Sequence, residues 1–501
     1  MRPVLERRGL AALMLAGALA GAVSFASVLR FGFVYDDHWT LVQSRVFDQP
    51  LRALLSAAAH GTAKAEGIPD ATRPAMTASV WLDHRLFGLR APGYHAHSLL
   101  DYALVCALGA LVLFALSRRR RVALLGAIVF AAAPLHAEVV ASINYREDLI
   151  AAAGVILPLA ALAGPWRWPR GTPGAVALGA IFLTGLCGKE SAVALLPLLC
   201  VAWAIRRPSR AALRGHEPLL LALGGALVLW LNWRLALRLG GDDVPTAPPS
   251  GTLAVLLDTA RFEVRAVLES VMLVRTAPEH AREAAASATW LLGLAGLLWL
   301  VVVLARRRVT RTPAIGIAIA LAAALPTSPL VGPANTRADR YLFLAVLGAA
   351  LCWGWLLDRL LARLPRAAAA LLFAAGAIGL GFACHTAAAP WRSDLSLWTV
   401  AVAKAPSAPR AWVGLSRARR VEGDFVGADA AIERAVALDP SFVQAHVTRA
   451  YGLLARGSVD AARREVVVID SLGGAEHRGM KRARRCATLS ARAAPACIGA
   501  P

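Results

Sequence analysis

Long apolar segments alternate with short polar ones along most of this chain. A run of about 20 apolar residues is long enough to cross a bilayer as a helix, and shorter runs pack beside such helices. The pattern predicts an all-α, polytopic membrane protein with about eleven transmembrane helices. The expected spans lie at 9–29, 97–116, 122–135, 148–164, 174–188, 190–205, 217–237, 288–305, 313–330, 340–358 and 367–387.

Arginine clusters mark every second connection between these spans. The strongest cluster is the run 118–121, which follows the second span directly. Loops rich in lysine and arginine stay in the cytoplasm, so the N-terminus is expected inside and the C-terminal region outside. Residues 18–20 resemble a signal-peptide cleavage site, but the apolar run continues to Leu29, which favours an uncleaved first helix.

Composition agrees with a membrane protein. The 501 residues are 57% hydrophobic, and the net charge is +22. Because the basic residues cluster between apolar runs, the charge is assigned to membrane topology and not to a nucleic-acid partner. Five of the seven cysteines lie in apolar segments, and no Cys-x-x-Cys spacing indicates a metal site.

The composition changes after Pro390. Pro406 and Pro440 stand 34 positions apart, which is the tetratricopeptide period. The predicted organisation is a membrane domain at 1–389, tetratricopeptide-like helices at 390–471, and a basic, disordered tail at 472–501. Cys486 and Cys497 lie in that tail on the exported side, where an oxidising compartment permits a disulfide.

Polar motifs gather on the predicted outer face. They begin with Tyr35-Asp36-Asp37, where two adjacent carboxylates follow the first span. The motifs that follow are Arg73-Pro74, Gly93-Tyr94-His95, Pro134 to Glu138, Tyr145 to Leu149, Gly188-Lys189-Glu190 and Ala338 to Leu342. Individually these groups are ordinary interfacial hydrogen-bonding residues or structural ion pairs. Their convergence on one face predicts a shared site.

Sugar transfer outside the cytoplasm requires a lipid-phosphate donor, since nucleotide sugars are absent there. A carboxylate must take the acceptor's hydroxyl proton, and fixed cations must stabilise the departing phosphate. Asp36 or Asp37 fits the first role, with Asp36 favoured; Arg146, Lys189 and Arg340 fit the second. Supporting or acceptor-binding roles are expected for Arg73, His95, His136, Glu138, Glu190, Asp339 and Tyr341.

The order of these motifs resembles the bacterial relatives of the transmembrane-and-tetratricopeptide O-mannosyltransferases, within the GT-C glycosyltransferase superfamily. The resemblance covers the chain to about residue 470. It implies about eleven spans, a polyprenyl-phosphate sugar donor, inverting transfer and Asp36 with Asp37 as the catalytic pair. The implied reaction moves a hexose, such as mannose, to Ser or Thr hydroxyls of exported proteins at a bacterial inner membrane.

Two other functions stay open. The chain is alternatively a non-catalytic membrane scaffold whose repeats recruit envelope proteins, or a transporter of a lipid-linked substrate. Charges at outer helix ends argue against the transporter. No cofactor is expected; a divalent metal at the Asp36–Asp37 pair is an alternative that is not favoured, because arginines can neutralise a single leaving phosphate. The sequence does not specify the sugar, the acceptor or the oligomeric state.

Overall fold

The computed structural model describes residues 2–60, 72–164, 172–206, 215–239, 251–273, 276–280, 285–331, 337–474, 480–490 and 492–498. These residues form helices and connections, and no strand occurs among them. The chain divides into two compact units. Unit 1 comprises Met1–Thr276 and Ala285–Arg392, and unit 2 comprises Ala277–Ala284 and Ser393–Pro501.

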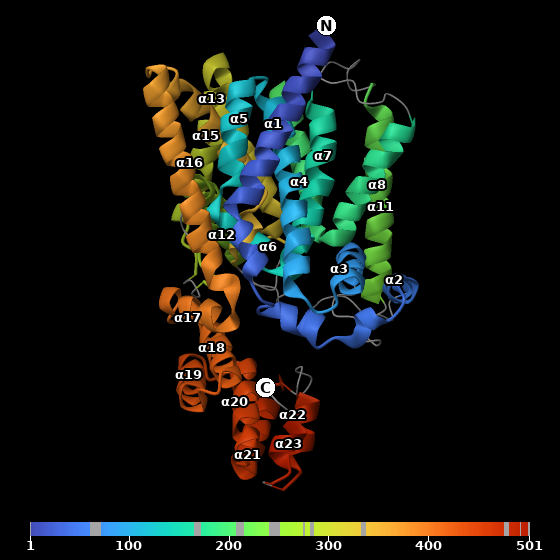
Figure 1. Ribbon diagram of the computed structural model, residues 1–501, viewed down its shortest axis with the longest axis vertical. Helices are drawn as coiled ribbons and strands as arrows, with labels where there is room; N and C mark the ends of the chain where they lie inside the picture. The colour runs from blue at the N-terminus through green and yellow to red at the C-terminus, as the bar shows by residue number, and fades with distance from the viewer. Residues whose placement is uncertain are drawn as a thin grey trace. The chain divides into compact units, whose positions relative to one another are not determined.

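Each expected span coincides with a helix of unit 1 (Figure 1). Within the described residues, five helical stretches can cross a membrane by length and composition, or six if the bent pair Arg120–Ala131 and Pro134–Ala141 forms one span. The remaining apolar helices fall short of that test because they are shorter or carry charges. The eleven helices are α1 (Arg2–Ser24), α4 (Ala91–Ser117), α5 (Arg120–Ala131), α7 (Arg146–Ala163), α8 (Thr172–Gly188), α9 (Leu195–Arg206), α11 (Glu217–Leu239), α13 (Thr289–Arg306), α14 (Arg311–Ala324), α15 (Ala345–Leu361) and α16 (Arg366–Ala388).

Close helix contacts depend on glycine. A Cβ atom at Gly17 would lie 2.8 Å from the backbone oxygen of Cys106, and one at Gly21 would lie 2.8 Å from the sulfur of Cys106. Between α7 and α8, a Cβ atom at Gly154 would lie 2.7 Å from the Cα atom of Gly185. Small residues four apart let membrane helices approach closely. The contact at Gly17 and Gly21 packs α1 closely against α4.

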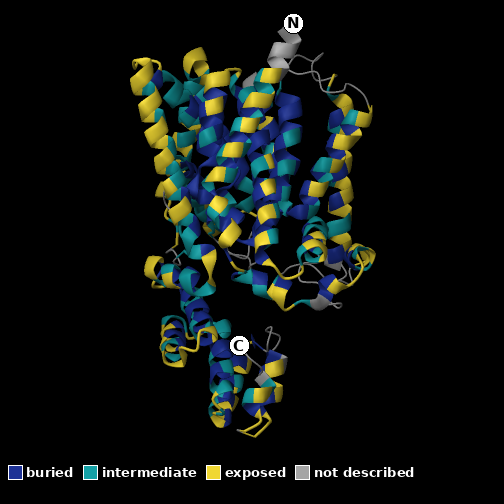
Figure 2. Ribbon diagram, viewed as in Figure 1, coloured by how far each residue is buried: buried dark blue, intermediate teal, exposed yellow. Residues whose placement is uncertain are grey.

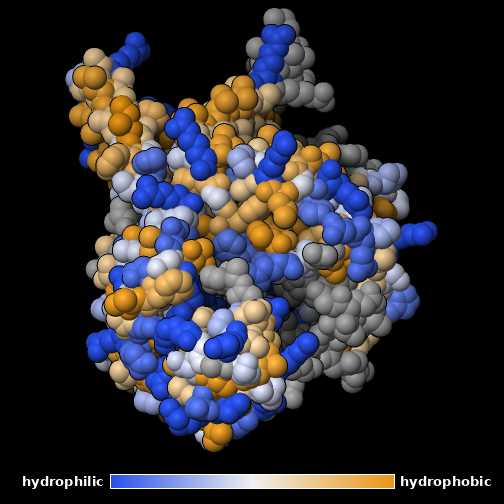
Figure 3. Space-filling model, turned by 60° about the horizontal axis from the view of Figure 1, so that its bottom comes forward, coloured by the Kyte–Doolittle hydropathy of each residue, from blue (hydrophilic) through white to orange (hydrophobic). Residues whose placement is uncertain are grey.

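The surface of the helical bundle is largely apolar. Buried residues lie mainly between the helices (Figure 2), while α13 and α16 present exposed leucine, valine, tryptophan and phenylalanine side chains. Figure 3 shows hydrophobic surface continuing along the flank of unit 1. Such a surface suits contact with lipid and not with water.

In the part of unit 1 that the structure describes, four further α-helices lie outside the expected spans. Helices α2 (Leu51–His60), α3 (Pro74–Phe87) and α6 (Ala137–Ala141) lie toward one end of the bundle, opposite the N-terminus (Figure 1). Helix α12 (Thr252–Met272) packs against α13, α14 and α15. The hydropathy pattern does not reveal α12, because its apolar positions are interrupted by five charged residues.

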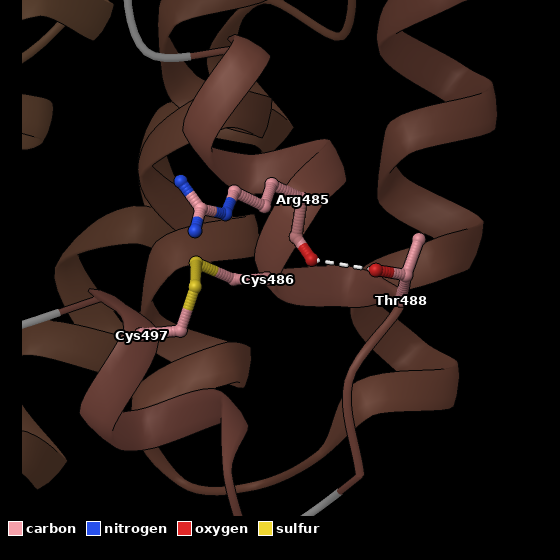
Figure 4. The surroundings of a disulfide bond; sticks show 4 residues. All are labelled: Arg485, Cys486, Thr488 and Cys497. Carbon is pink, nitrogen blue, oxygen red and sulfur yellow. Dashed lines mark hydrogen bonds between the residues drawn. A yellow bond between two sulfur atoms is a disulfide. The ribbon is translucent and has the colours of Figure 1, made fainter.

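Unit 2 consists of short helices joined as hairpins. After α17 (Asp394–Lys404) come α18 (Pro409–Val421), α19 (Phe425–Leu438), α20 (Val443–Ala455) and α21 (Val459–Ser471). Helices α18 and α20 begin 34 residues apart, and so do α19 and α21. The described part of the tail is not disordered as expected: it forms α22 (Met480–Ala487) and α23 (Ala494–Ile498). A Cys486–Cys497 disulfide joins these two helices (Figure 4).

Candidate functional site

The acidic pair lies in the connection that follows α1. Its backbone is held to the end of unit 1, because Gly32 N–H donates to the carbonyl of Arg392 over 3.3 Å. Tyr35, directly before the pair, has a φ of 54°, a left-handed conformation that disfavours a bulky side chain. Strained backbone of this kind persists where the surrounding structure fixes it, and often lies at functional sites.

Asp37 is fully buried and fastens two loops together. Its carboxylate accepts hydrogen bonds from Val34 N–H over 3.1 Å and from Asn144 N–H over 2.9 Å. Burial raises the pKa of Asp37 from 3.8 to about 7, although the backbone hydrogen bonds act to lower it. These hydrogen bonds and the complete burial of Asp37 fit a residue that fixes the conformation of the loop.

Asp36, in contrast, is only partly buried. Asp36 interacts electrostatically with Tyr145, whose hydroxyl also interacts with Arg340, Tyr35 and Glu138. The pKa of Tyr145 is raised well above its usual value, mainly by burial. Tyr145 therefore lies between the acidic loop and a cation that is about 200 residues away in sequence.

That cation is Arg340, in the short helix η9 (Asp339–Leu342). Its guanidinium lies 4.2 Å from the ring centre of Tyr145 and 5.0 Å from that of Tyr341. It is ion-paired with Glu138, which also accepts the Arg340 backbone N–H over 3.0 Å. Two aromatic faces and a carboxylate thus fix the orientation of Arg340. Asp339 is buried at the start of η9.

A second ionic cluster holds Arg73 and Lys189. Lys189 Nζ lies 3.0 Å from Glu147 and 2.7 Å from Asp148, at the start of α7. Arg73 is paired with Glu147 and, over 3.1 Å, with Glu190. The two clusters are coupled, because Lys189 interacts electrostatically with both Arg73 and Arg340.

Arg146 lies in a separate environment. Its side chain is 0% exposed and pairs with the equally buried Asp83 over 2.6 Å. It donates to the Ser98 hydroxyl over 3.0 Å, the Ser79 hydroxyl over 2.9 Å and the Tyr94 carbonyl over 2.8 Å. With its guanidinium enclosed by protein groups, Arg146 joins α3, α4 and α7, and the geometry favours a structural role over the expected phosphate contact.

Both candidate histidines are also enclosed. His95 Nε2–H donates to the carbonyl of Gly32 over 3.2 Å, which holds the first loop against α4. His136 shares a 2.8 Å hydrogen bond with the Tyr102 hydroxyl, and its ring centre lies 4.3 Å from that of Phe343. Neither imidazole is exposed, so both fit positioning roles and not direct acceptor contact.

The structure thus brings together Tyr145, Glu138, Arg340 and Tyr341, with Lys189 and Arg73 next along the network, and Asp36 interacts electrostatically with Tyr145. Arg146 pairs with Asp83, and His136 bonds to Tyr102. Sequence reasoning missed Asp83, because a single acid in an amphipathic stretch carries no distinguishing signal. Within the described ranges, no group of three or more His, Cys, Asp or Glu side chains is placed to hold a metal ion.

The chain was compared with protein-family models, curated proteins and solved structures. No family model, curated protein or solved structure matches this chain.

Proposed function

We propose that this chain is an inverting, integral-membrane glycosyltransferase of the GT-C type that uses a polyprenyl-phosphate sugar donor. One observation carries the proposal. A partly exposed carboxylate, Asp36, and a fixed cation, Arg340, both act on one buried tyrosine, Tyr145, although they come from opposite ends of unit 1. Sugar transfer from a phosphate requires a base for the acceptor hydroxyl and a group that stabilises the departing anion. Asp36 is the proposed base, and Arg340 is the proposed anion-stabilising group.

Each group then has a role. Asp36 takes the proton of an acceptor Ser or Thr hydroxyl while the oxygen of that hydroxyl bonds to the anomeric carbon of the sugar. The bond from that carbon to the phosphate oxygen breaks at the same time, and the phosphate leaves with the electron pair. Arg340 stabilises that phosphate, with Lys189 and Arg73 reinforcing the positive potential. Asp37 holds the loop that presents Asp36.

The cationic side chains differ in how far they are exposed, and a more exposed side chain can contact the phosphate more easily. The Arg73 side chain is 20% exposed and that of Arg340 is 11% exposed, against 5% for Lys189 and none for Arg146. Arg340 and Arg73 are therefore the proposed phosphate ligands, and Lys189 acts at longer range. Glu138 and Glu190 keep the two arginines oriented, and Tyr341 stacks on Arg340. No cofactor is needed in this scheme.

The proposed topology treats all eleven apolar helices as spans, because each ends at a polar connection. The arginine-rich connections then lie in the cytoplasm with the N-terminus. The acidic loop lies outside, and so does Arg392, which contacts Gly32 there. We place the chain in a bacterial inner membrane, with unit 2 following on the outer side.

Unit 2 fits the proposed acceptor module. Its 34-residue recurrence of helical hairpins is that of tetratricopeptide repeats, which stack and bind peptides. The Cys486–Cys497 disulfide supports an oxidising compartment outside the cytoplasm. Exported proteins are accordingly the proposed acceptors, and mannose is the proposed sugar.

The test is a transfer assay with the full-length protein in lipid nanodiscs. Polyprenyl-phosphate mannose and other polyprenyl-phosphate hexoses are incubated with a Ser/Thr peptide library, and the added hexose mass is recorded. Asp36→Asn is expected to lower turnover by about a hundredfold or more, the usual contribution of a general base. Asp258→Asn, which removes a carboxylate paired with Arg261 on α12, serves as the matched control. Equal turnover in Asp36→Asn and the control would remove Asp36 from the mechanism.

A membrane scaffold is the second candidate, favoured by the helical hairpins of unit 2. It predicts that removal of residues 393–501 abolishes partner capture, while Asp36→Asn leaves capture unchanged. The wild-type chain would then add no hexose to any peptide in the library.

A further inference from the structure

Helix α12 carries buried polar side chains that the proposed reaction does not use. The Glu263 side chain is almost completely buried, with 4% of the residue exposed. Neither of its carboxyl oxygens has a hydrogen-bond partner among the described residues. The hydroxyl oxygens of Thr259 and Ser270 are enclosed in the same way, also without a partner there. Buried polar groups are almost always satisfied, so three on one helix require an explanation.

The three side chains lie on one face of α12. At 3.6 residues per turn, Thr259 precedes Glu263 by about one turn, and Ser270 follows it by about two. The row from 259 to 270 is therefore about 16 Å long. Ala260 and Val267, which flank the row, are buried as well. The row therefore lies inside the packed helices.

Charged groups on α12 and its neighbours are engaged elsewhere. Arg261 pairs with Asp258 over 2.6 Å, and Arg265 lies 5.4 Å from the ring centre of Trp290. Glu269 pairs with Arg337. On the helices packed against α12, the charged residues lie in the terminal turns: Arg306 on α13, Arg311 on α14, and Asp358 with Arg359 on α15. Thus, within the described chain, no cation neutralises Glu263.

The energetics favour a protonated acid in contact with water. An ionised carboxylate without a partner costs several kcal/mol in this environment. A neutral acid avoids that cost, but its oxygens still need hydrogen bonds. One carboxylate and one hydroxyl a turn away supply too few oxygens for Ca²⁺ or Mg²⁺. Water, which both donates and accepts, satisfies hydroxyls and a carboxylic acid alike, as buried water does in polar interiors.

We propose that Thr259, Glu263 and Ser270 form an internal water-binding row in which Glu263 holds an exchangeable proton. The row is a second chemical site in unit 1, independent of the glycosyltransferase proposal. Helix α12 packs against α13, α14 and α15, and a protonatable carboxyl buried against membrane helices is a usual element of proton relays. Its proton enters and leaves through the row of waters that the two hydroxyls hold.

Infrared difference spectroscopy of the full-length protein in nanodiscs tests this. The spectrum of the wild type minus that of Glu263→Gln is expected to show the carbonyl stretch of a protonated carboxylic acid. This band should shift when H₂O is replaced by D₂O. The matched control, Glu269→Gln, removes an ion-paired carboxylate on the same helix and should give no such band. An Asp37→Asn background excludes a contribution from Asp37, a buried acid whose carboxyl is also expected to be partly protonated near pH 7.

The absence of the band would mean that Glu263 is ionised, and a band unaffected by D₂O would mean that water does not reach it. Either result overturns the proposal. A second measurement needs no variant: a hydrophobic carbodiimide, which attacks protonated carboxyls, should modify Glu263 and leave Glu269 intact by mass spectrometry. Equal modification of both residues, or of neither, would also contradict it.

Discussion

Replacing Arg146 with methionine distinguishes a structural cation from a phosphate ligand. Methionine keeps much of the side-chain volume but removes the charge and all five donors. In the structure, Asp83 would then be left with His97, 2.6 Å away, and with no other cation inside hydrogen-bond distance among the described residues. The hydroxyls of Ser79 and Ser98 and the Tyr94 carbonyl would each lose a donor.

The expected loss is large because both partners of the pair are 0% exposed. Removing one member of a buried ion pair costs about 3–5 kcal/mol. For a unit the size of unit 1, this corresponds to a fall of roughly 4–6 °C in the unfolding temperature. The assay is thermal unfolding in detergent, followed by tryptophan fluorescence and by the monodisperse fraction.

Arg121 provides the matched control. It also pairs with a carboxylate, Asp358, but its side chain is 53% exposed. Arg121→Met should therefore change the stability by less than about 1 kcal/mol. If Arg146→Met unfolds at the wild-type temperature and loses only the binding of the lipid-phosphate donor, the structural role of Arg146 is refuted. Arg146 would then be a ligand of the donor phosphate.

Two further predictions concern a buried acid and the disulfide. The folded pKa of Asp37, about 7 against an ordinary 3.8, means that the fold binds this proton more tightly than the unfolded chain does. The resulting stabilisation, at most about 4 kcal/mol, is complete below pH 4 and disappears as the pH rises through 7. Asp37→Asn should flatten the pH dependence of unfolding between pH 4 and 7, and an unchanged slope would contradict the assignment. Cys486→Ser removes a disulfide that closes a short loop, and should lower the stability of unit 2 by about 2–3 kcal/mol. Proteolysis under non-reducing conditions measures the effect, and equal cleavage of variant and wild type would show that the bond contributes nothing.

Much of the fold can be predicted from the sequence because membrane helices are specified by local hydropathy. Each of the eleven apolar segments is helical in the structure. The 34-residue spacing of Pro406 and Pro440 likewise matches the recurrence of the helical hairpins. Helix α12 could not be predicted this way, since its burial depends on contacts with α13, α14 and α15 and not on its own composition.

The candidate site is harder to predict, because the same residue types serve both chemistry and packing. Arg340 and Arg146 are both arginines beside helix starts, yet one lies over two aromatic rings and the other is enclosed with Asp83. The environment that separates Asp36 from Asp37 is likewise set by Asn144, more than 100 residues away. Pairings at such separations have no signature in a single sequence.

The claim on which this account depends is that Asp36 and Arg340 serve one donor site. An electron cryomicroscopy structure of the protein in nanodiscs with a polyprenyl-phosphate hexose tests it most directly. The account predicts the phosphate within hydrogen-bond distance of Arg340 and the anomeric carbon on the side facing Asp36. A phosphate bound elsewhere, with Arg340 still enclosed by Glu138, Tyr145 and Tyr341, would contradict it.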